Sequence, residues 1–237
     1  MLHEVVVDKP GALGDALAER FAGEGRHALS ARGRFAVALP GGSVARAFFP
    51  HLAALPFDWS RAELFQCDER AVPPSDPESN YALARALWLE PARVPRARFH
   101  RMEGEAADLH EAAAAYAHAL RRVLGTPPRL DLVLLGAGED GHVCSLFPGH
   151  ALLRRRAWVA ALTDAPKPPP RRLTLTLPAL RAAETIVVAA LGDAKAGAVR
   201  DALEDEACSS PLALVARGAR RAFFLLDHAA ASRLSRR

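Results

Sequence analysis

The chain has 237 residues, of which 50% are hydrophobic, and its formal net charge at pH 7 is +4. A chain of this length can bury a substantial core in one α/β domain or in two closely packed lobes, and we favour one domain spanning residues 1–237. Because the sequence has no run of eighteen apolar residues and no signal-peptide pattern at its start, we expect a cytoplasmic protein with no membrane partner.

Cysteine usage indicates reduced thiols. Cys67, Cys144 and Cys208 are far apart in the sequence, odd in number and not arranged as Cys-x-x-Cys. This pattern argues against both a disulfide framework and a structural zinc site.

The positive charge is carried almost wholly by arginine, since lysine occurs only at Lys9, Lys167 and Lys195. An excess of positive charge suits a small anionic substrate. The basic residues are interleaved with acidic ones, and the densest run, residues 154–156, has no aromatic platform beside it. We therefore do not expect nucleic acid as a partner.

Strand and helix patterns alternate along the first half of the chain. Short runs bounded by breakers predict strands at residues 5–7, 35–39, 63–67 and 98–102. Helical spacing of apolar residues predicts helices at 13–29, 44–55, 81–89 and 108–124.

The second half continues the alternation. It predicts strands at residues 132–135, 158–162, 171–177, 185–191 and 222–226, with a helix at 196–205 and a helical turn at 211–215. Asp227 is expected to cap a terminal helix. Such alternation predicts an α/β fold with a mostly parallel, layered, Rossmann-like sheet flanked by helices.

Residues 130–150 hold the densest set of chemically active side chains. The strand predicted at 132–135 is followed by Gly136, Gly138, Glu139, Asp140, Gly141 and His142. Glycines allow unusual backbone conformations, and the carboxyl end of a strand is where α/β sheets bind ligands. We therefore expect an active site here, with His142 at its centre.

The same stretch matches the dinucleotide-binding pattern Gly-x-Gly-x-x-Gly, with Asp164 at the expected distance beyond it. That fold requires a helix to begin at the third glycine. Here Pro148 and Gly149 leave room for barely one turn, so a nicotinamide or flavin cofactor is not expected.

Other interpretations of this loop remain open. His142 alone could be a buried histidine that hydrogen-bonds a backbone carbonyl. Cys144 or Ser145 as a nucleophile would need a base or a sharp strand-to-helix elbow that the sequence does not indicate. A metal site made by Asp140, His142 and His150 would lack a recognised ligand spacing.

Two further segments end predicted strands with polar residues. Gly41, Gly42 and Ser43 lie between a strand and a helix, so they form either an ordinary turn capped by Ser43 or a phosphate cradle made of backbone N–H groups. Residues 68–70, Asp-Glu-Arg, form either a surface salt-bridge cluster or part of a ligand site. Ser79 is expected to cap the helix that follows.

With these segments in hand, the chain resembles the 6-phosphogluconolactonase family over nearly its full length. The matching segments are Gly41-Gly42-Ser43, Asp68-Glu69-Arg70, Ser79-Asn80, the run from Leu135 to His150 that contains Asp140-Gly141-His142, Arg172-Leu173-Thr174-Leu175, and Gly192-x-x-Lys195. They occur in the family's order, and the run around His142 is specific.

The resemblance implies hydrolysis of 6-phospho-D-glucono-1,5-lactone in the pentose phosphate pathway by a carboxylic ester hydrolase. It implies no metal or organic cofactor. We expect a monomer or a weak homo-oligomer. His142 would be the general base on water, without a covalent intermediate, and Asp140 and Arg70 would assist it. The substrate and its phosphate would be bound by Gly41, Gly42, Ser43, Asp68, Arg172 and Lys195.

The chain departs from the family at Val44-Ala45, where Thr-Pro is usual, which removes a hydroxyl near the expected phosphate site. Arg46, Arg70, Arg172 and Lys195 all remain candidates for the phosphate contact. The main alternative is a related glucosamine-6-phosphate deaminase or isomerase, but the Asn-Glu-Pro segment of that family is replaced here by residues 145–148. A non-catalytic sugar-phosphate-binding protein on the same fold is the second alternative.

Overall fold

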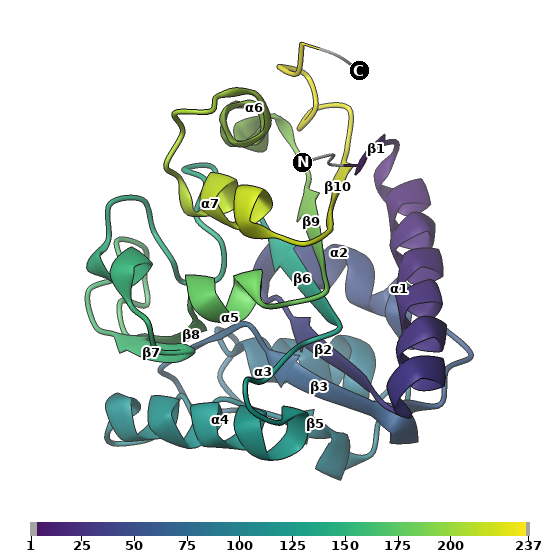
Figure 1. Ribbon diagram of the computed structural model, residues 1–237, viewed down its shortest axis with the longest axis vertical. Coiled ribbons are helices and arrows are strands. Elements are labelled where there is room, and N and C mark those ends of the chain that lie inside the picture. The colour runs from purple at the N-terminus through teal and green to yellow at the C-terminus, as the bar shows by residue number, and fades with distance from the viewer. Residues whose placement is uncertain (1–3, 236–237) are drawn as a thin grey trace.

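Seven parallel strands form the central sheet of the computed structural model, which describes residues 4–235 (Figure 1). From one edge to the other the strands are β1 (Glu4–Val7), β10 (Ala222–Leu226), β9 (Thr185–Ala190), β6 (Leu132–Gly136), β2 (Phe35–Leu39), β3 (Ala62–Gln66) and β5 (Phe99–His100). The expected mostly parallel, layered α/β sheet is confirmed.

A second, three-stranded antiparallel sheet lies beside the main one (Figure 1). It contains β4 (Asp68–Arg70), β8 (Arg172–Leu175) and β7 (Val159–Leu162), and Arg70 pairs with Arg172. The sequence did not predict β4. The strand predicted at 171–177 was also too long, because α5 (Leu177–Arg181) begins there with a proline in its first turn.

Helices cover both faces of the main sheet (Figure 1). One face packs against α1 (Pro10–Arg32), α2 (Gly42–Ala53) and α3 (Asn80–Ala84) with its π-helical continuation Arg85–Leu89. The other packs against α4 (Leu109–Leu124), α5, α6 (Ala196–Glu204), α7 (Pro211–Gly218) and the small sheet. Short 3₁₀ turns occur at Trp59–Arg61, Arg96–Arg98, Ala151–Arg154 and Asp193–Lys195.

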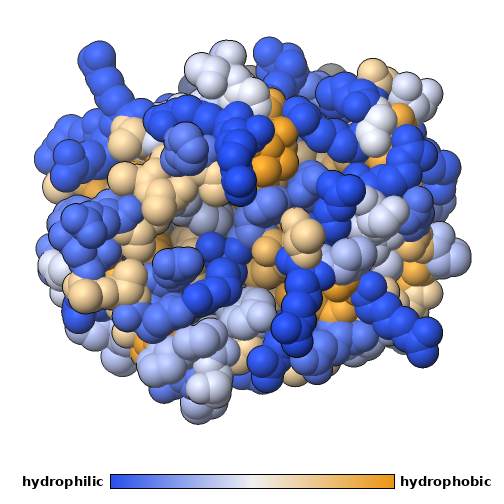
Figure 2. All heavy atoms as spheres, turned by 90° about the horizontal axis from the view of Figure 1, so that it is seen from below, coloured by the Kyte–Doolittle hydropathy of each residue, from blue (hydrophilic) through white to orange (hydrophobic). Residues whose placement is uncertain are grey.

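The central strands are apolar on both sides, as expected for a parallel sheet buried between two layers. In β6, Leu132 and Leu134 face the α1 and α2 layer, whereas Val133 and Leu135 face the α4 layer. The face seen in Figure 2 is mostly hydrophilic, with apolar residues in patches between hydrophilic ones. Most of the large apolar side chains of residues 4–235 are buried in the two core layers.

Several element boundaries differ from the sequence expectations. Helix 81–89 changes to a π-helix at Arg85, and the strand expected at 98–102 is limited to Phe99–His100. Asp227 does not cap a helix, because turns follow β10 as far as the described chain extends. Its carboxylate instead accepts hydrogen bonds from the N–H groups of Gly192 and Ala230. No helix within residues 4–235 is long and apolar enough to cross a membrane.

The order of the strands creates a switch point between β2 and β6. From β2 the chain proceeds outward through β3 and β5, then returns to the opposite side of β2 as β6 and continues outward through β9 and β10. The connections that leave the carboxyl ends of β2 and β6 therefore diverge. In open α/β sheets, a crevice at such a point is the usual ligand site.

Candidate active site

An open cavity of about 160 Å³ lies at this switch point. The predicted site residues that line it are Gly41, Gly42, Ser43, Asp68, Arg70, His142, Arg172 and Lys195. Asp140 does not line the cavity but hydrogen-bonds the His142 ring. Segments that are far apart in the sequence therefore meet around one space.

His142 faces this cavity from the loop after β6, with 21% of its side chain exposed. Its Nδ1 lies 2.5 Å from Oδ1 of Asp140, and its ring packs 4.8 Å from the Phe147 ring. Burial lowers the pKa of His142 from its ordinary 6.5, although Asp140 acts to raise it. The imidazole is therefore neutral at pH 7, and donation from Nδ1–H to the carboxylate leaves Nε2 as a proton acceptor.

Asp140 is the natural partner for this tautomer. Burial acts to raise the pKa of Asp140, but the hydrogen bonds from the ring and the backbone N–H of His142 hold it below its usual value. An ionised carboxylate accepts the Nδ1–H bond and orients the ring.

Glycines shape the loop that carries His142. The Gly138 N–H donates to the His142 carbonyl at 2.9 Å, and the Gly141 N–H donates to the Gly138 carbonyl at 3.0 Å. A Cβ on Gly138 would lie 2.0 Å from Nδ1 of His142, and Gly141 has φ +76°. A side chain at Gly138 would therefore occupy the space of the imidazole.

The alternatives for this loop fit the structure poorly. No helix begins at Gly141; the segment instead forms a turn with an isolated bridge between Val143 and Leu146, so it lacks the helix start that the dinucleotide-binding fold requires. His150 pairs with Asp164 through Nε2 at 3.1 Å rather than joining His142. Within residues 4–235, no three His, Cys, Asp or Glu side chains are grouped closely enough to hold a metal ion.

Backbone from the turn before α2 forms another wall of the cavity. Gly41 is the N-cap residue and Gly42 has φ +67°, and no side chain caps the helix, so Ser43 does not act as the cap. The first N–H groups of a helix have no partner within it and attract anions. Val44 and Ala45 are buried and do not line the cavity.

The side chains of the Asp68-Glu69-Arg70 triplet point to two different environments, the cavity and the protein interior. Asp68 and Arg70 line the cavity, whereas the Glu69 side chain is buried. Asp68 accepts hydrogen bonds from the Ser145 hydroxyl at 2.7 Å and from the Asn80 amide at 3.0 Å. The triplet is therefore not a surface salt-bridge cluster.

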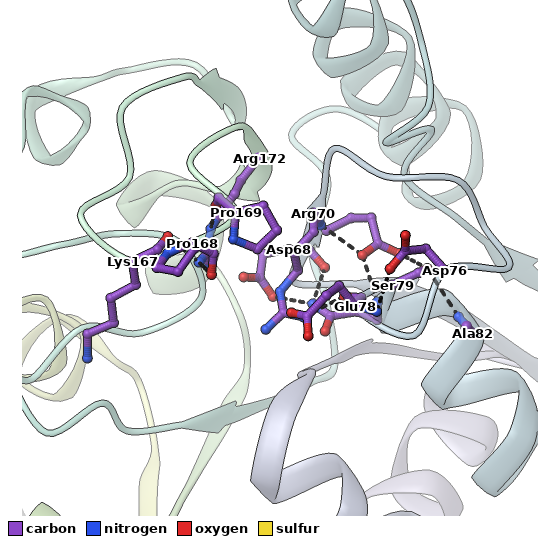
Figure 3. Close-up of polar contacts among 12 residues, drawn as sticks. Asp68, Arg70, Asp76, Glu78, Ser79, Ala82, Lys167, Pro168, Pro169 and Arg172 are labelled. Atoms are coloured by element: carbon purple, nitrogen blue, oxygen red, sulfur yellow. Dashed lines mark hydrogen bonds and ion pairs between the residues drawn. The ribbon is translucent and has the colours of Figure 1, made fainter.

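Arg70 is held in place by the loop that follows β4. It donates to the Glu78 carbonyl, and its Nη1 lies 3.6 Å from the Glu78 carboxylate (Figure 3). Its buried Nε has no hydrogen-bond partner among the described residues. The loop therefore holds the Arg70 guanidinium beside the cavity.

The other candidate cations differ in how their donors are used. Arg172 is 5% exposed, and most of its N–H groups donate to the backbone carbonyls of residues 167–169 (Figure 3). Lys195 lies at the start of α6, with Nζ 3.4 Å from a Glu139 carboxylate oxygen. Arg46 is exposed and does not line the cavity.

Sequence reasoning did not assign site roles to Asn80, Cys144 or Ser145. Asn80 and Cys144 line the cavity, and Ser145 is fully buried behind Asp68. The pKa of the Cys144 thiol is raised well above its ordinary value, mainly by a hydrogen bond with Cys67 and secondly by burial. This thiol therefore stays protonated. The Ser79-Asn80 dipeptide was the available signal for Asn80, but it also fits an ordinary helix start, and Ser79 does cap α3.

The fold and its cavity define a Rossmann-like α/β protein with a candidate ligand site at the sheet's switch point, where cationic side chains suit a small anion. Residues 8–224 match the family model described as glucosamine-6-phosphate isomerases/6-phosphogluconolactonase. The chain belongs to this family.

Individual relatives extend over most of the chain. The 6-phosphogluconolactonase of Rattus norvegicus is 40% identical, over 97% of this chain and 93% of its own. The 6-phosphogluconolactonase of Homo sapiens is 41% identical, over 94% of this chain and 90% of its own. The solved structure of 6-phosphogluconolactonase from Trypanosoma brucei superimposes with a TM-score of 0.85 at 26% identity and covers 99% of both chains.

Proposed function

We propose that this protein hydrolyses 6-phospho-D-glucono-1,5-lactone to 6-phosphogluconate. Relatives about 40% identical that bear the name 6-phosphogluconolactonase support assignment to the ester hydrolases. The observation that carries the proposal is the His142–Asp140 pair, which presents a neutral imidazole to a cavity with cationic walls. A base, an anion site and an open cavity are what lactone hydrolysis requires.

In the proposed reaction, Nε2 of His142 takes a proton from water as the water oxygen attacks the lactone carbonyl carbon. The carbonyl becomes an oxyanion, which the Arg70 guanidinium stabilises. As the oxyanion re-forms the carbonyl, the bond to the ring oxygen breaks and that oxygen receives the proton from His142. Asp140 orients the imidazole and stabilises its transient positive charge.

A covalent intermediate is unnecessary in this scheme because a lactone is already an activated ester. The nearest nucleophilic side chains are also poorly suited to the task. The Cys144 thiol has a raised pKa, and the buried Ser145 hydroxyl donates to Asp68.

The phosphate is proposed to bind at the opposite side of the cavity, on the N–H groups of Gly42 and Ser43 at the start of α2. Lys195 would supply the opposing positive charge. Arg172 would contribute less directly, since its guanidinium is largely occupied by backbone carbonyls. Asp68 keeps unused lone pairs that suit the sugar hydroxyls.

The test is acid release from freshly generated 6-phosphogluconolactone, measured against the uncatalysed rate. His142→Gln should lower kcat by about 10²–10⁴-fold, the usual contribution of a general base. His118→Gln, a change at an exposed histidine on α4, is the matched control and should leave kcat unchanged. Near-normal turnover by His142→Gln would remove the histidine from the mechanism. Ammonia release from glucosamine 6-phosphate would instead indicate the deaminase reaction.

A further inference from the structure

A proline-rich loop between β7 and β8 reaches toward the active site. The Arg172 Nε donates to the Pro169 carbonyl at 2.9 Å, and its Nη2 donates to the carbonyls of Lys167 at 2.8 Å and Pro168 at 3.1 Å (Figure 3). The Ala165 N–H closes the loop on the Pro170 carbonyl at 3.0 Å. A buried guanidinium needs hydrogen-bond acceptors for its N–H groups. The carbonyls of residues 167–169 satisfy Arg172, and Arg172 in turn fixes the backbone of these residues; we call this arrangement the Arg172 clamp.

The hydrogen bonds from Arg172 fix the position of the Lys167 backbone. The prolines that follow Lys167 also restrict the φ angles of the loop. A lysine on a loop without such contacts would lose much side-chain and backbone freedom on forming an ion pair, whereas the backbone of this loop is already held by hydrogen bonds to Arg172. Because its backbone is fixed, the Lys167 side chain can place its ammonium only within a small region beside the active site.

That region contains the Asp140 carboxylate. Nζ of Lys167 lies 3.5 Å from Oδ1 of Asp140, the same oxygen that lies 2.5 Å from Nδ1 of His142. An ammonium from one loop and an imidazole from another thus share one carboxylate oxygen. Lys167 does not line the cavity itself, in contrast to Lys195.

We propose that Lys167 is a positioning residue of the active site: its ammonium anchors the Asp140 carboxylate and places positive charge beside His142, which keeps the imidazole unprotonated. The inference rests on the proposed role of His142 as the base. Lys167 acts through Asp140 and does not line the cavity.

The charges around His142 support this role. Its pKa is lowered first by burial and is also lowered by Lys167, whereas Asp140 and Asp68 act to raise it. Three further cations, Arg70, Arg172 and Lys195, line the same cavity. A carboxylate that orients a base also favours its protonated form, and the ammonium of Lys167 opposes that effect.

The decisive experiment removes this charge with Lys167→Met and follows the His142 ring by NMR as pH is varied. The His142 signal is identified by its loss in His142→Gln. Because the Lys167–Asp140 pair is partly exposed, we expect the pKa of His142 to rise by about half a unit. The acid limb of kcat/KM should move to higher pH by the same amount, while the plateau above it stays within about twofold of wild type.

Two variants control for the substitution. Lys167→Arg keeps the charge and should restore the wild-type titration. Lys9→Met makes the same change at the start of α1 and should shift neither the titration nor the pH profile. The difference between Lys167→Met and wild type should also shrink at about 1 M salt, where exposed charges are screened, whereas an effect of altered loop packing would persist.

An unmoved His142 titration in Lys167→Met would overturn the proposal. A raised KM with an unchanged pH profile would do so as well, because it would indicate a direct substrate contact. The NMR titration needs no substrate, so it tests Lys167 even if the protein fails to hydrolyse the lactone.

Discussion

Gly138 allows the His142 ring to occupy its place in the loop. The smallest side chain added at this position would overlap Nδ1 of the imidazole, and Oδ1 of Asp140 would be 2.6 Å from the new Cβ. The glycine therefore contributes space for both members of the pair.

We predict that Gly138→Ala lowers kcat by at least about tenfold, because a base displaced by roughly an ångström loses its alignment. The comparison is steady-state kinetics with circular dichroism as a check on folding. Gly11→Ala places the same methyl group in open space on α1 and should leave kcat unaltered. A fully active Gly138→Ala enzyme would show that the His142 ring can move away from the added methyl group and still function.

At this scale the sequence predicted which loops meet better than it predicted what each side chain does. His142, Arg70 and Lys195 were expected at strand ends, and the structure brings them to one cavity. The separation of Glu69 from its neighbours, and the clamp formed by Arg172, depend on the direction of each side chain and on distant backbone carbonyls. Neither is encoded in local spacing.

Glu69 connects three elements: β4, the loop that follows it and α3. Its carboxylate accepts backbone N–H bonds from Arg70, Asn80 and Tyr81, and side-chain bonds from Gln66 and Ser79. Burial raises the pKa of Glu69, although these bonds oppose that effect. Burying the ionised carboxylate is unfavourable, but its hydrogen bonds fix the position of the segment that carries Arg70.

We predict that Glu69→Gln destabilises the protein by about 2–3 kcal/mol, since an amide NH₂ group would face donors and leave them unsatisfied. Urea denaturation at pH 7 measures the change. Because the pKa of Glu69 is raised by folding, its ionisation weakens the wild type as pH rises through the folded-state pKa. The pH dependence from this group should be absent in Glu69→Gln.

Glu103→Gln, at an exposed position, is the control and should change stability by no more than about 0.5 kcal/mol. Equal stability of Glu69→Gln and wild type would mean that the loop after β4 is held by other contacts.

Elements with a strong apolar pattern were predicted well. β2 and β10 were predicted to the residue, because their buried runs end at clear breakers. β4 was missed because it consists of three charged residues whose pairing with β8 is a long-range contact. The change from α-helix to π-helix at Arg85 has no sequence signal that we recognise.

The two core layers share one sheet, and we propose that the chain folds as one domain. Trp59 and Trp88 lie in the layer of α1 and α2, whereas Trp158 packs against the opposite layer. β2, β3, β6, β9 and β10 each contribute side chains to both layers, so the loss of one layer exposes the strands that support the other.

We predict that both layers unfold in a single transition. One variant keeps only Trp158, by Trp59→Phe and Trp88→Phe, and a second keeps the other two, by Trp158→Phe. In each variant, the urea midpoint by tryptophan fluorescence should coincide with the midpoint by far-UV circular dichroism. Separate midpoints within one variant would indicate two independently stable units.

The parallel pairing of β1 with β10 has a consequence for the order of events during synthesis. β1 is made before any other described strand, yet its partner is completed only at Leu226. All the residues that line the cavity have been translated once Lys195 is added. On the ribosome, the cavity can thus assemble around β2, β3 and β6 before β10 is available to pair with β1 at the edge of the sheet.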